Sequence, residues 1–257
     1  MNFAQRYFIE FAYDGLNYHG WQKQPDAVTV QEKLEEGLSL LLRQKIVTTG
    51  AGRTDAGVHA KQMYAHFDLD SKIHLKNITF RLNRWLPQDI SIFSVFSVAE
   101  EDHTRFHAVS RSYEYHFHLR PDPFHNKTSY ILHRKPDFKL MDKAAKVLLD
   151  YSNFQCFSRS KTQVITYICD ITEARFEFDG YHVVFHITAD RFLRNMVRAI
   201  VGTLLEIGYR KNTIEGMHTI IKSKNRSAAG ASAPARGLYL TKVTYPESVL
   251  KNRNETF

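Results

Sequence analysis

The sequence predicts a mixed α/β or α+β fold with a large content of sheet. Aromatic residues make up 13% of the chain, with 18 Phe and 13 Tyr against 2 Trp, and such rings suit the half-buried surface of a pleated sheet. Segments with alternating apolar residues are interleaved with segments of helical periodicity. The 257 residues, 43% of them hydrophobic, are enough for one large domain or two modest ones.

The first half of the chain predicts a compact set of strands and helices. Strands are expected at residues 7–13, 62–67 and 90–98, a loop rich in aromatic and polar groups at 14–25, and a short helix near 77–86. Another helix begins near Thr29, because Thr29 and Glu32 have the spacing of a capping box. Its apolar stripe, expected to face the core, consists of Val30, Leu34, Leu38, Leu41 and Leu42.

The second half repeats this theme. Strands are expected at residues 112–119, near 168–178 and 181–188, and at 238–245. Helices are expected at 140–151, near 191–207 and at about 213–223. The small residues at 227–237 predict a loop.

A polar run at residues 100–105, EEDHTR, indicates where the halves divide. The sequence therefore predicts an N-terminal α/β half at residues 1–104, a C-terminal α/β half at 105–246 and a frayed polar tail at 247–257.

Charge and cysteine content narrow the partners and the compartment. The formal net charge of +8 is compatible with a polyanionic partner, although charge alone can also serve solubility. Cys156 and Cys169 form no C-x-x-C pair, so both are expected as small core residues of a protein in a reducing compartment. No signal-like segment or apolar run long enough for a membrane span is visible, so we expect a cytoplasmic protein.

The segment GAGRTDAGVHA at residues 50–60 places Arg53 and Asp55 among three glycines. Such a segment lets the backbone approach a ligand closely while it presents both charges. A surface turn with an ion pair is the alternative. The spacing matches neither a P-loop nor a dinucleotide-binding turn.

Two further segments carry candidate functional residues. In RSYEYHFHL, Tyr113 begins a strand and could stack on a base, whereas His116 and His118 share a face without a third ligand at a recognisable spacing, so no metal is expected there. In RFLRNMVRAIVG, Arg191, Arg194 and Arg198 would line one face of the expected helix. A buried arginine there needs a carboxylate or phosphate partner.

Together these segments make the chain resemble the tRNA pseudouridine synthase A family. The resemblance runs from YFIEFAYDGLNYHGWQKQ through GRTDAGVHA, RSYEY and FLRNMVRAIVG to APARGLYL, and only about the last dozen residues lie outside it. It implies two pseudo-symmetric halves that share a mixed, largely antiparallel sheet, with flanking helices and a central cleft. It also implies a homodimer.

The resemblance implies an isomerase that converts uridine to pseudouridine at positions 38, 39 and 40 in the anticodon stem and loop of tRNA. Asp55 would be the catalytic aspartate, Arg53 would help to hold the flipped nucleotide and Tyr113 would pack on the target base. Arg198 would be the ion-pair partner of Asp55, and Leu238 a core or pocket-lining residue. No cofactor and no metal are expected, because the isomerisation needs neither a redox step nor a metal.

Two alternatives remain open on the sequence. A non-catalytic RNA-binding or RNA-folding protein of the same fold would not need an aspartate at position 55, and an enzyme acting on a small nucleoside would not need the positive surface. The segment at residues 151–160, YSNFQCFSRS, departs from the family pattern. Substrate contacts from that loop are therefore not carried over.

Overall fold

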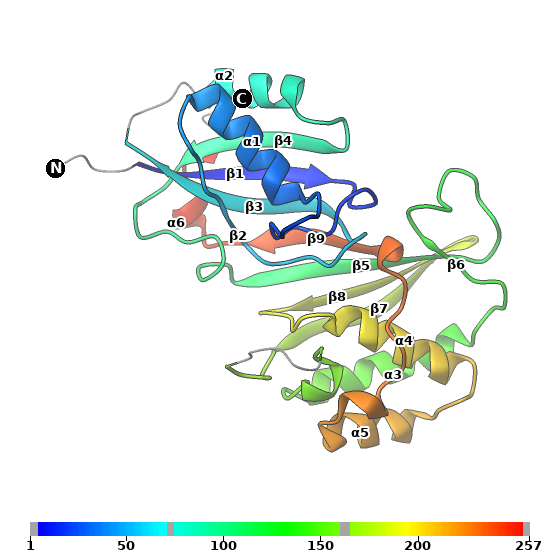
Figure 1. Cartoon of the computed structure of the whole chain (residues 1–257). Coiled ribbons are helices and arrows are strands. Elements are labelled where there is room, and N and C mark those ends of the chain that lie inside the picture. Colours follow the sequence, from blue (N-terminus) through cyan, green and yellow to red (C-terminus); the bar gives the residue numbers. More distant parts are fainter. Residues whose placement is uncertain (1–4, 71–74, 160–164, 254–257) are drawn as a thin grey trace. The chain divides into compact units, whose positions relative to one another are not determined.

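The computed structural model describes residues 5–70, 75–159 and 165–253. The colours in Figure 1 follow the sequence from the N-terminus to the C-terminus. The chain forms two compact units. The first comprises Met1–Val109 together with Leu240–Phe257, and the second comprises Ser110–Tyr239.

This division differs from the one expected from the sequence, which assigned residues 240–246 to the second half and 247–257 to a tail. The polar run at 100–105, expected at the boundary, lies inside the first unit. Thr104 is fully buried, and its carbonyl accepts a hydrogen bond from the Tyr245 hydroxyl, so both ends of the first unit pack together.

The fold class expected from the sequence is confirmed. Each unit combines strands with flanking helices. The pairs β1–β3, β1–β4, β2–β3, β5–β8 and β7–β8 are antiparallel, and β5 (Ser110–His118) pairs with β6 (Tyr130–Ile131) in parallel. The sheet is therefore mixed and mostly antiparallel.

In the first unit the strands lie in the order β4-β1-β3-β9. Their bounds are Gln5–Tyr13 for β1, His59–Leu69 for β3, Ile90–Ser97 for β4 and Leu238–Thr244 for β9, and the two-residue β2 at Thr49–Gly50 pairs with β3. Side chains on the paired strands β1 and β3 fill the core, as Tyr7 and Phe67 do by stacking at 5.7 Å.

Two helices pack on this sheet, α1 (Val30–Leu42) and α2 (Leu75–Trp85) (Figure 1). The capping prediction for α1 is confirmed, because the Thr29 hydroxyl accepts a hydrogen bond from the Glu32 amide at 3.3 Å. Val30, Leu34 and Leu38 are completely buried. The expected stripe thus faces the core, and it fades toward the C-terminal turn of α1, where the last two leucines are half-buried.

The chain from 247 to 253 packs on the first unit. Short helix α6 (Glu247–Leu250) buries Val249, and the Arg253 guanidinium donates two hydrogen bonds of 2.7 Å to the carboxylate of the buried Glu10. The described part of this segment is therefore not a frayed tail. Its anchor is a partner 243 residues away, which no local pattern reveals.

In the second unit the strands lie in the order β5-β8-β7, with β7 at Ile171–Asp179 and β8 at His182–Ala189. Helix α3 (Phe138–Lys146), which continues into the 3-10 turn η1 (Val147–Asp150), contacts both β7 and α4 (Met196–Gly208). Helix α5 (Ile214–Ser223) packs on α3 (Figure 1). Cys156 and Cys169 are both fully buried free thiols, as the sequence predicted.

The expected helix at residues 191–207 begins later than predicted. Asn195 adopts a left-handed conformation with φ 67°, and α4 starts only at Met196. Arg191 and Arg194 therefore lie outside the helix, and the predicted stripe of three arginines on one helical face is wrong. Only Arg198 belongs to α4.

Within the part of the chain described, no helix combines the length and apolar character required to cross a bilayer.

Candidate active site

Asp55 lies in the loop between β2 and β3 of the first unit, where it is half-buried. Arg53, in the same loop, is exposed. The Val58 amide donates a hydrogen bond of 3.2 Å to the Asp55 carbonyl, which closes a turn immediately after the aspartate. Gly57 occupies this turn with φ 75°, a conformation that a residue with a Cβ adopts only at a cost.

Thr54, the residue before Asp55, is buried and anchors this loop. Its hydroxyl is hydrogen-bonded to the Tyr13 hydroxyl at 2.8 Å and accepts a hydrogen bond of 3.1 Å from the Trp21 amide. Both partners are core residues. The polar loop is thus fastened to the aromatic core through one small hydroxyl.

A second loop, residues 14–25, presses against the Asp55 loop at two glycines. A Cβ on Gly20, which has φ 86°, would lie 2.3 Å from the Thr54 carbonyl oxygen, and one on Gly15 would lie 1.9 Å from that of Val58. Both positions require glycine, because the backbones touch. The DGLNYHGW segment therefore serves to seat the aspartate loop.

Tyr113 lies on β5 of the second unit, opposite Ile187 of β8, and is half-buried. Its ring meets the ring of Phe192 edge to face, with centroids 5.1 Å apart and planes at 85°. Such an arrangement holds the tyrosine ring in one orientation. Phe192 comes from the irregular segment before α4, so that segment, rather than a helix, positions Tyr113.

Arg198 lies in the first turns of α4 and is half-buried. Its Nε donates a hydrogen bond of 2.8 Å to the Ala233 carbonyl, and the Ala233 amide donates one of 2.9 Å to the Arg198 carbonyl. These two bonds tie the arginine to the small-residue segment that follows α5. The Nε nitrogen of Arg198 therefore holds the side chain in place through Ala233.

The small-residue segment at 227–237 approaches α4 very closely. A Cβ on Gly202 would lie 1.7 Å from the Ala231 carbonyl oxygen. Arg226, the residue before this segment, stabilises it by donating hydrogen bonds to the carbonyls of Ala229 and Gly230. The segment ends at Leu238, the first residue of β9, which is buried with 6% exposure.

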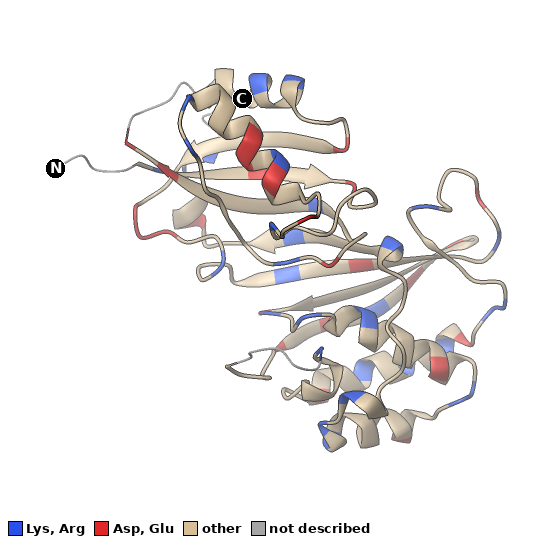
Figure 2. Cartoon of the chain, viewed as in Figure 1, with Lys and Arg blue, Asp and Glu red and all other residues tan. Residues whose placement is uncertain are grey.

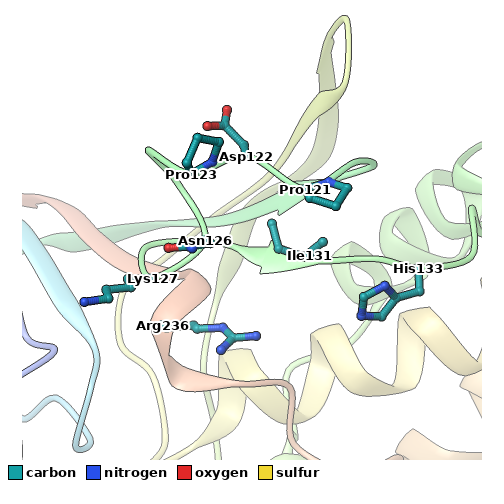
Figure 3. Close-up of a pocket in the computed structure, with 8 residues that line it drawn as sticks. All are labelled: Pro121, Asp122, Pro123, Asn126, Lys127, Ile131, His133 and Arg236. Carbon is teal, nitrogen blue, oxygen red and sulfur yellow. The ribbon is translucent and has the colours of Figure 1, made fainter.

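A pocket of about 630 Å³ opens in the second unit (Figure 3). We call it the cationic pocket, because its lining has two cations, Lys127 and Arg236, and one carboxylate, Asp122. Figure 3 shows Lys127 and Arg236 extending from different segments at its border. The sequence had singled out neither residue, and the only available signal was a basic residue beside small ones in APARG. The lining residues are Pro121, Asp122, Pro123, Asn126, Lys127, Ile131, His133 and Arg236.

Positive residues are not confined to one segment. Figure 2 shows Lys and Arg on strands and helices of both units. Of the residues expected at the site, Arg53 and Asp55 belong to the first unit, and Tyr113, Arg198 and Leu238 belong to the second.

Comparison with known proteins assigns the family. A sequence profile described as tRNA pseudouridine synthase matches residues 144–246. The chain is 48% identical to tRNA pseudouridine synthase A of Parabacteroides distasonis over 95% of this chain and 98% of that protein. It is 47% identical to the protein of the same name from Bacteroides fragilis over 96% and 99% of the two chains.

The chain belongs to the tRNA pseudouridine synthase A family. A more distant member, tRNA pseudouridine synthase A 2 of Clostridium perfringens, is 39% identical over 92% of this chain and 98% of its own. Identity at this level spans both units, so the family assignment covers the Asp55 loop as well as β5 and α4.

The segment that departs from the family pattern is largely internal packing in this structure. Phe154 and Phe157 are fully buried and stacked at 6.4 Å, and Cys156 lies between them in the 3-10 turn η2 (Gln155–Phe157). Ser160, the last residue of that segment, lies outside the described residues.

Proposed function

We propose that this protein isomerises uridine to pseudouridine at positions 38, 39 and 40 in the anticodon stem and loop of tRNA, with Asp55 as its catalytic carboxylate. The observation that carries the proposal is the Asp55 loop itself. A carboxylate, half-buried, stands on a turn that needs Gly57 and is anchored to the core through Thr54. Membership of the tRNA pseudouridine synthase A family supplies the reaction.

The isomerisation sets clear demands on the site. The N1–C1′ glycosidic bond breaks, the uracil turns while it stays bound, and a C5–C1′ bond forms. C5 then loses its proton and N1 carries one, so the composition of the nucleotide does not change. A carboxylate near C1′ and a surface that retains the detached base are needed.

Asp55 meets the first demand by either of two routes. It attacks carbon to give a covalent intermediate, or it removes a ribose proton to give a glycal. Both routes need the charged carboxylate. A bidentate guanidinium favours that form and orients both oxygens, and for this role we propose Arg198, whose Nε is already held by Ala233.

Tyr113 meets the second demand in this proposal. Its ring, held edge to face by Phe192, packs on the target base, and either Tyr113 or Asp55 accepts the C5 proton. Arg53, exposed in the Asp55 loop, helps to hold the flipped nucleotide. Leu238 serves as a core or pocket-lining residue near the site.

Binding requires the uridine to leave its stack, which costs a few kcal/mol. Contacts of Lys and Arg with RNA phosphates offset this cost, and the formal net charge of +8 provides for them. We propose that the protein acts as a homodimer in the cytoplasm and reads the anticodon arm largely by shape.

The test uses release of tritium from uridine C5. Purified protein is mixed with an unmodified tRNA transcript that carries tritium at C5 of its uridines. A matched transcript has cytidine at positions 38, 39 and 40. Release is expected from the first transcript and not from the second. Equal release from both would contradict the proposed positions, and no release from either would contradict the proposed reaction.

Salt dependence tests the RNA contacts separately. The logarithm of tRNA affinity should fall with the logarithm of salt concentration with a slope of about −0.7 to −0.9 for each phosphate contact. A flat response would instead favour an enzyme that acts on a small nucleoside.

A further inference from the structure

A cluster of histidines and one carboxylate lies at the end of β5 in the second unit, and no residue of the proposed catalytic set belongs to it. His118 is the last residue of β5 and is opposite His182 on β8. It is 7% exposed. After His118 the chain forms a loop, residues 119–129, before β6 begins.

This loop folds back and brings two further ligand types to His118. One ligand atom from each of His118, Asp122 and His125 lies within 4.8 Å of the others. Oδ2 of Asp122 is 3.8 Å from His118 Nδ1 and 3.0 Å from His125 Nδ1. Within the described ranges, this is the one group of three such residues so arranged.

The loop is held in this shape without help from a ligand. Oδ1 of Asp122 accepts a hydrogen bond of 2.9 Å from the Phe124 amide, and the Ser129 hydroxyl donates one of 2.6 Å to the His125 carbonyl. The imidazole rings of His118 and His125 stack at 4.9 Å with planes 13° apart. The arrangement is therefore preorganised, which lowers the cost of binding.

We propose that His118, Asp122 and His125 bind a divalent transition-metal ion of the Zn²⁺ class. Two imidazoles and a carboxylate match the preference of such ions, and three protein ligands leave one position for water. In tetrahedral coordination with metal–ligand bonds of about 2.0–2.2 Å, neighbouring ligand atoms lie about 3.3–3.5 Å apart. The distances of 3.0 and 3.8 Å to Asp122 lie on either side of that value, and all three ligand atoms lie within 4.8 Å of one another, so binding requires the side chains to draw together around the ion.

Such an ion would brace the loop at residues 119–129 against the end of β5. Asp122 and Lys127 of this loop also line the cationic pocket (Figure 3). The site thus joins a strand end to one wall of that pocket. The sequence excluded a metal here because only His116 and His118 were visible as a pair on the strand.

The test is metal titration of tag-free protein from which metal has been removed with a chelator. Isothermal titration calorimetry with ZnCl₂ should give one equivalent bound, and Co²⁺ should give the visible absorption of a tetrahedral site. His125→Ala and Asp122→Asn should each weaken Zn²⁺ binding at least about tenfold, because loss of a residue that only hydrogen-bonds to a metal ligand already costs about 10–100-fold.

The matched control is His107→Ala. His107 is also an exposed histidine, and its Nδ1 lies 3.1 Å from Oδ1 of Asp102, but this pair is not part of a three-ligand group among the described residues. Its loss should leave Zn²⁺ binding unchanged. Thermal melting without metal checks that every variant is folded, and tritium release from tRNA in the presence of chelator checks the isomerase separately.

Absence of Zn²⁺ and Co²⁺ binding by the wild-type protein would overturn the proposal. Equal Zn²⁺ affinity in wild type, His125→Ala and Asp122→Asn would overturn it as well.

Discussion

The two units hold their functional side chains in different ways. In the first unit the proposed catalytic residue, Asp55, stands on a loop, and Tyr13 and Trp21 hold that loop through Thr54. In the second unit Arg198 stands on a regular helix, and a loop comes to it, with Ala233 exchanging hydrogen bonds with it. Both arrangements depend on a close backbone approach at a glycine, Gly20 in the first unit and Gly202 in the second.

In the proposed mechanism, Asp55 in the first unit reacts with the substrate, and Arg198 in the second unit orients the Asp55 carboxylate. A loop seated by neutral hydrogen bonds places a carboxylate without neutralising it, whereas a helix with a braced guanidinium supplies a fixed charge. Substitutions in the second unit should therefore affect turnover with little effect on folding. Those at the glycines where the backbone of residues 14–25 touches the Asp55 loop should affect both.

Tyr113→Phe should have the largest effect among the side chains of the second unit. If the hydroxyl accepts the C5 proton, its loss should lower the turnover by about 10²–10⁴-fold, while the ring still packs on Phe192 and tRNA binding is nearly unchanged. Tritium release and tRNA affinity are the measurements. Tyr113→Ala should lose binding too, and equal turnover of wild type and the Phe variant would limit Tyr113 to packing.

Arg198→Lys should lower turnover by about 10²-fold, since a point charge cannot hold both oxygens of Asp55 and misplacement of a reacting group by about 1 Å costs that much. Binding of tRNA should fall much less. Arg194→Lys is the matched control, because Arg194 is exposed and lies before α4. An equal loss of turnover and affinity in Arg198→Lys would show that Arg198 contacts phosphate instead.

Gly20→Ala should lower both stability and turnover. A Cβ there meets the Thr54 carbonyl oxygen at 2.3 Å, and φ is 86°, so the free energy of unfolding should fall by about 1–3 kcal/mol. Displacement of the Asp55 loop should lower turnover about tenfold.

Gly52→Ala is the control for that variant, because a Cβ at Gly52 has no neighbour within 4 Å. It should change the free energy of unfolding by less than about 1 kcal/mol, as measured by urea denaturation. Equal effects of the two variants would contradict the close approach at Gly20.

His66 should make the free energy of unfolding depend on pH below about 6.5. Turnover at neutral pH should not depend on this residue. Burial, followed by the charges of Arg6 and His103, lowers the pKa of His66 to about 4, with a smaller opposing effect from Asp68. The unfolded chain, with an ordinary histidine pKa of about 6.5, then binds more protons, so stability falls as the pH drops from about 6.5 to 4.

The loss attributable to His66 should reach at most about 3 kcal/mol at pH 4. Comparing urea denaturation of wild type and His66→Gln between pH 7 and pH 4 measures it. The variant should show the shallower pH dependence, and an identical dependence in both proteins would contradict the assignment to His66.

Much of the fold follows from local patterns and was predictable. The helix at Thr29 and the helix at Thr213 both begin where a threonine caps the first turn, because each hydroxyl accepts a hydrogen bond from a backbone amide, that of Glu32 and that of Gly216. Strand β8 alternates buried and half-buried residues along its whole length. These elements are determined within a few residues of sequence.

The rest depends on contacts distant in sequence or on backbone conformations that the pattern does not reveal. The late start of α4 depends on a left-handed Asn195 whose side chain donates a hydrogen bond to Ser232. The C-terminal segment depends on Glu10. Arg236 and the group of Asp122 with His125 become visible only when the loops that carry them are folded.

Asp55 is the proposed catalytic carboxylate of the isomerisation. The most direct test of this role is tritium release from C5-labelled tRNA by Asp55→Asn, measured beside tRNA binding, with Asp14→Asn as a control. Asp14 lies in the adjoining loop and contacts His59. The account predicts that Asp55→Asn binds tRNA nearly as the wild type does and releases no tritium, and that Asp14→Asn still releases it. Substantial turnover by Asp55→Asn would contradict the account.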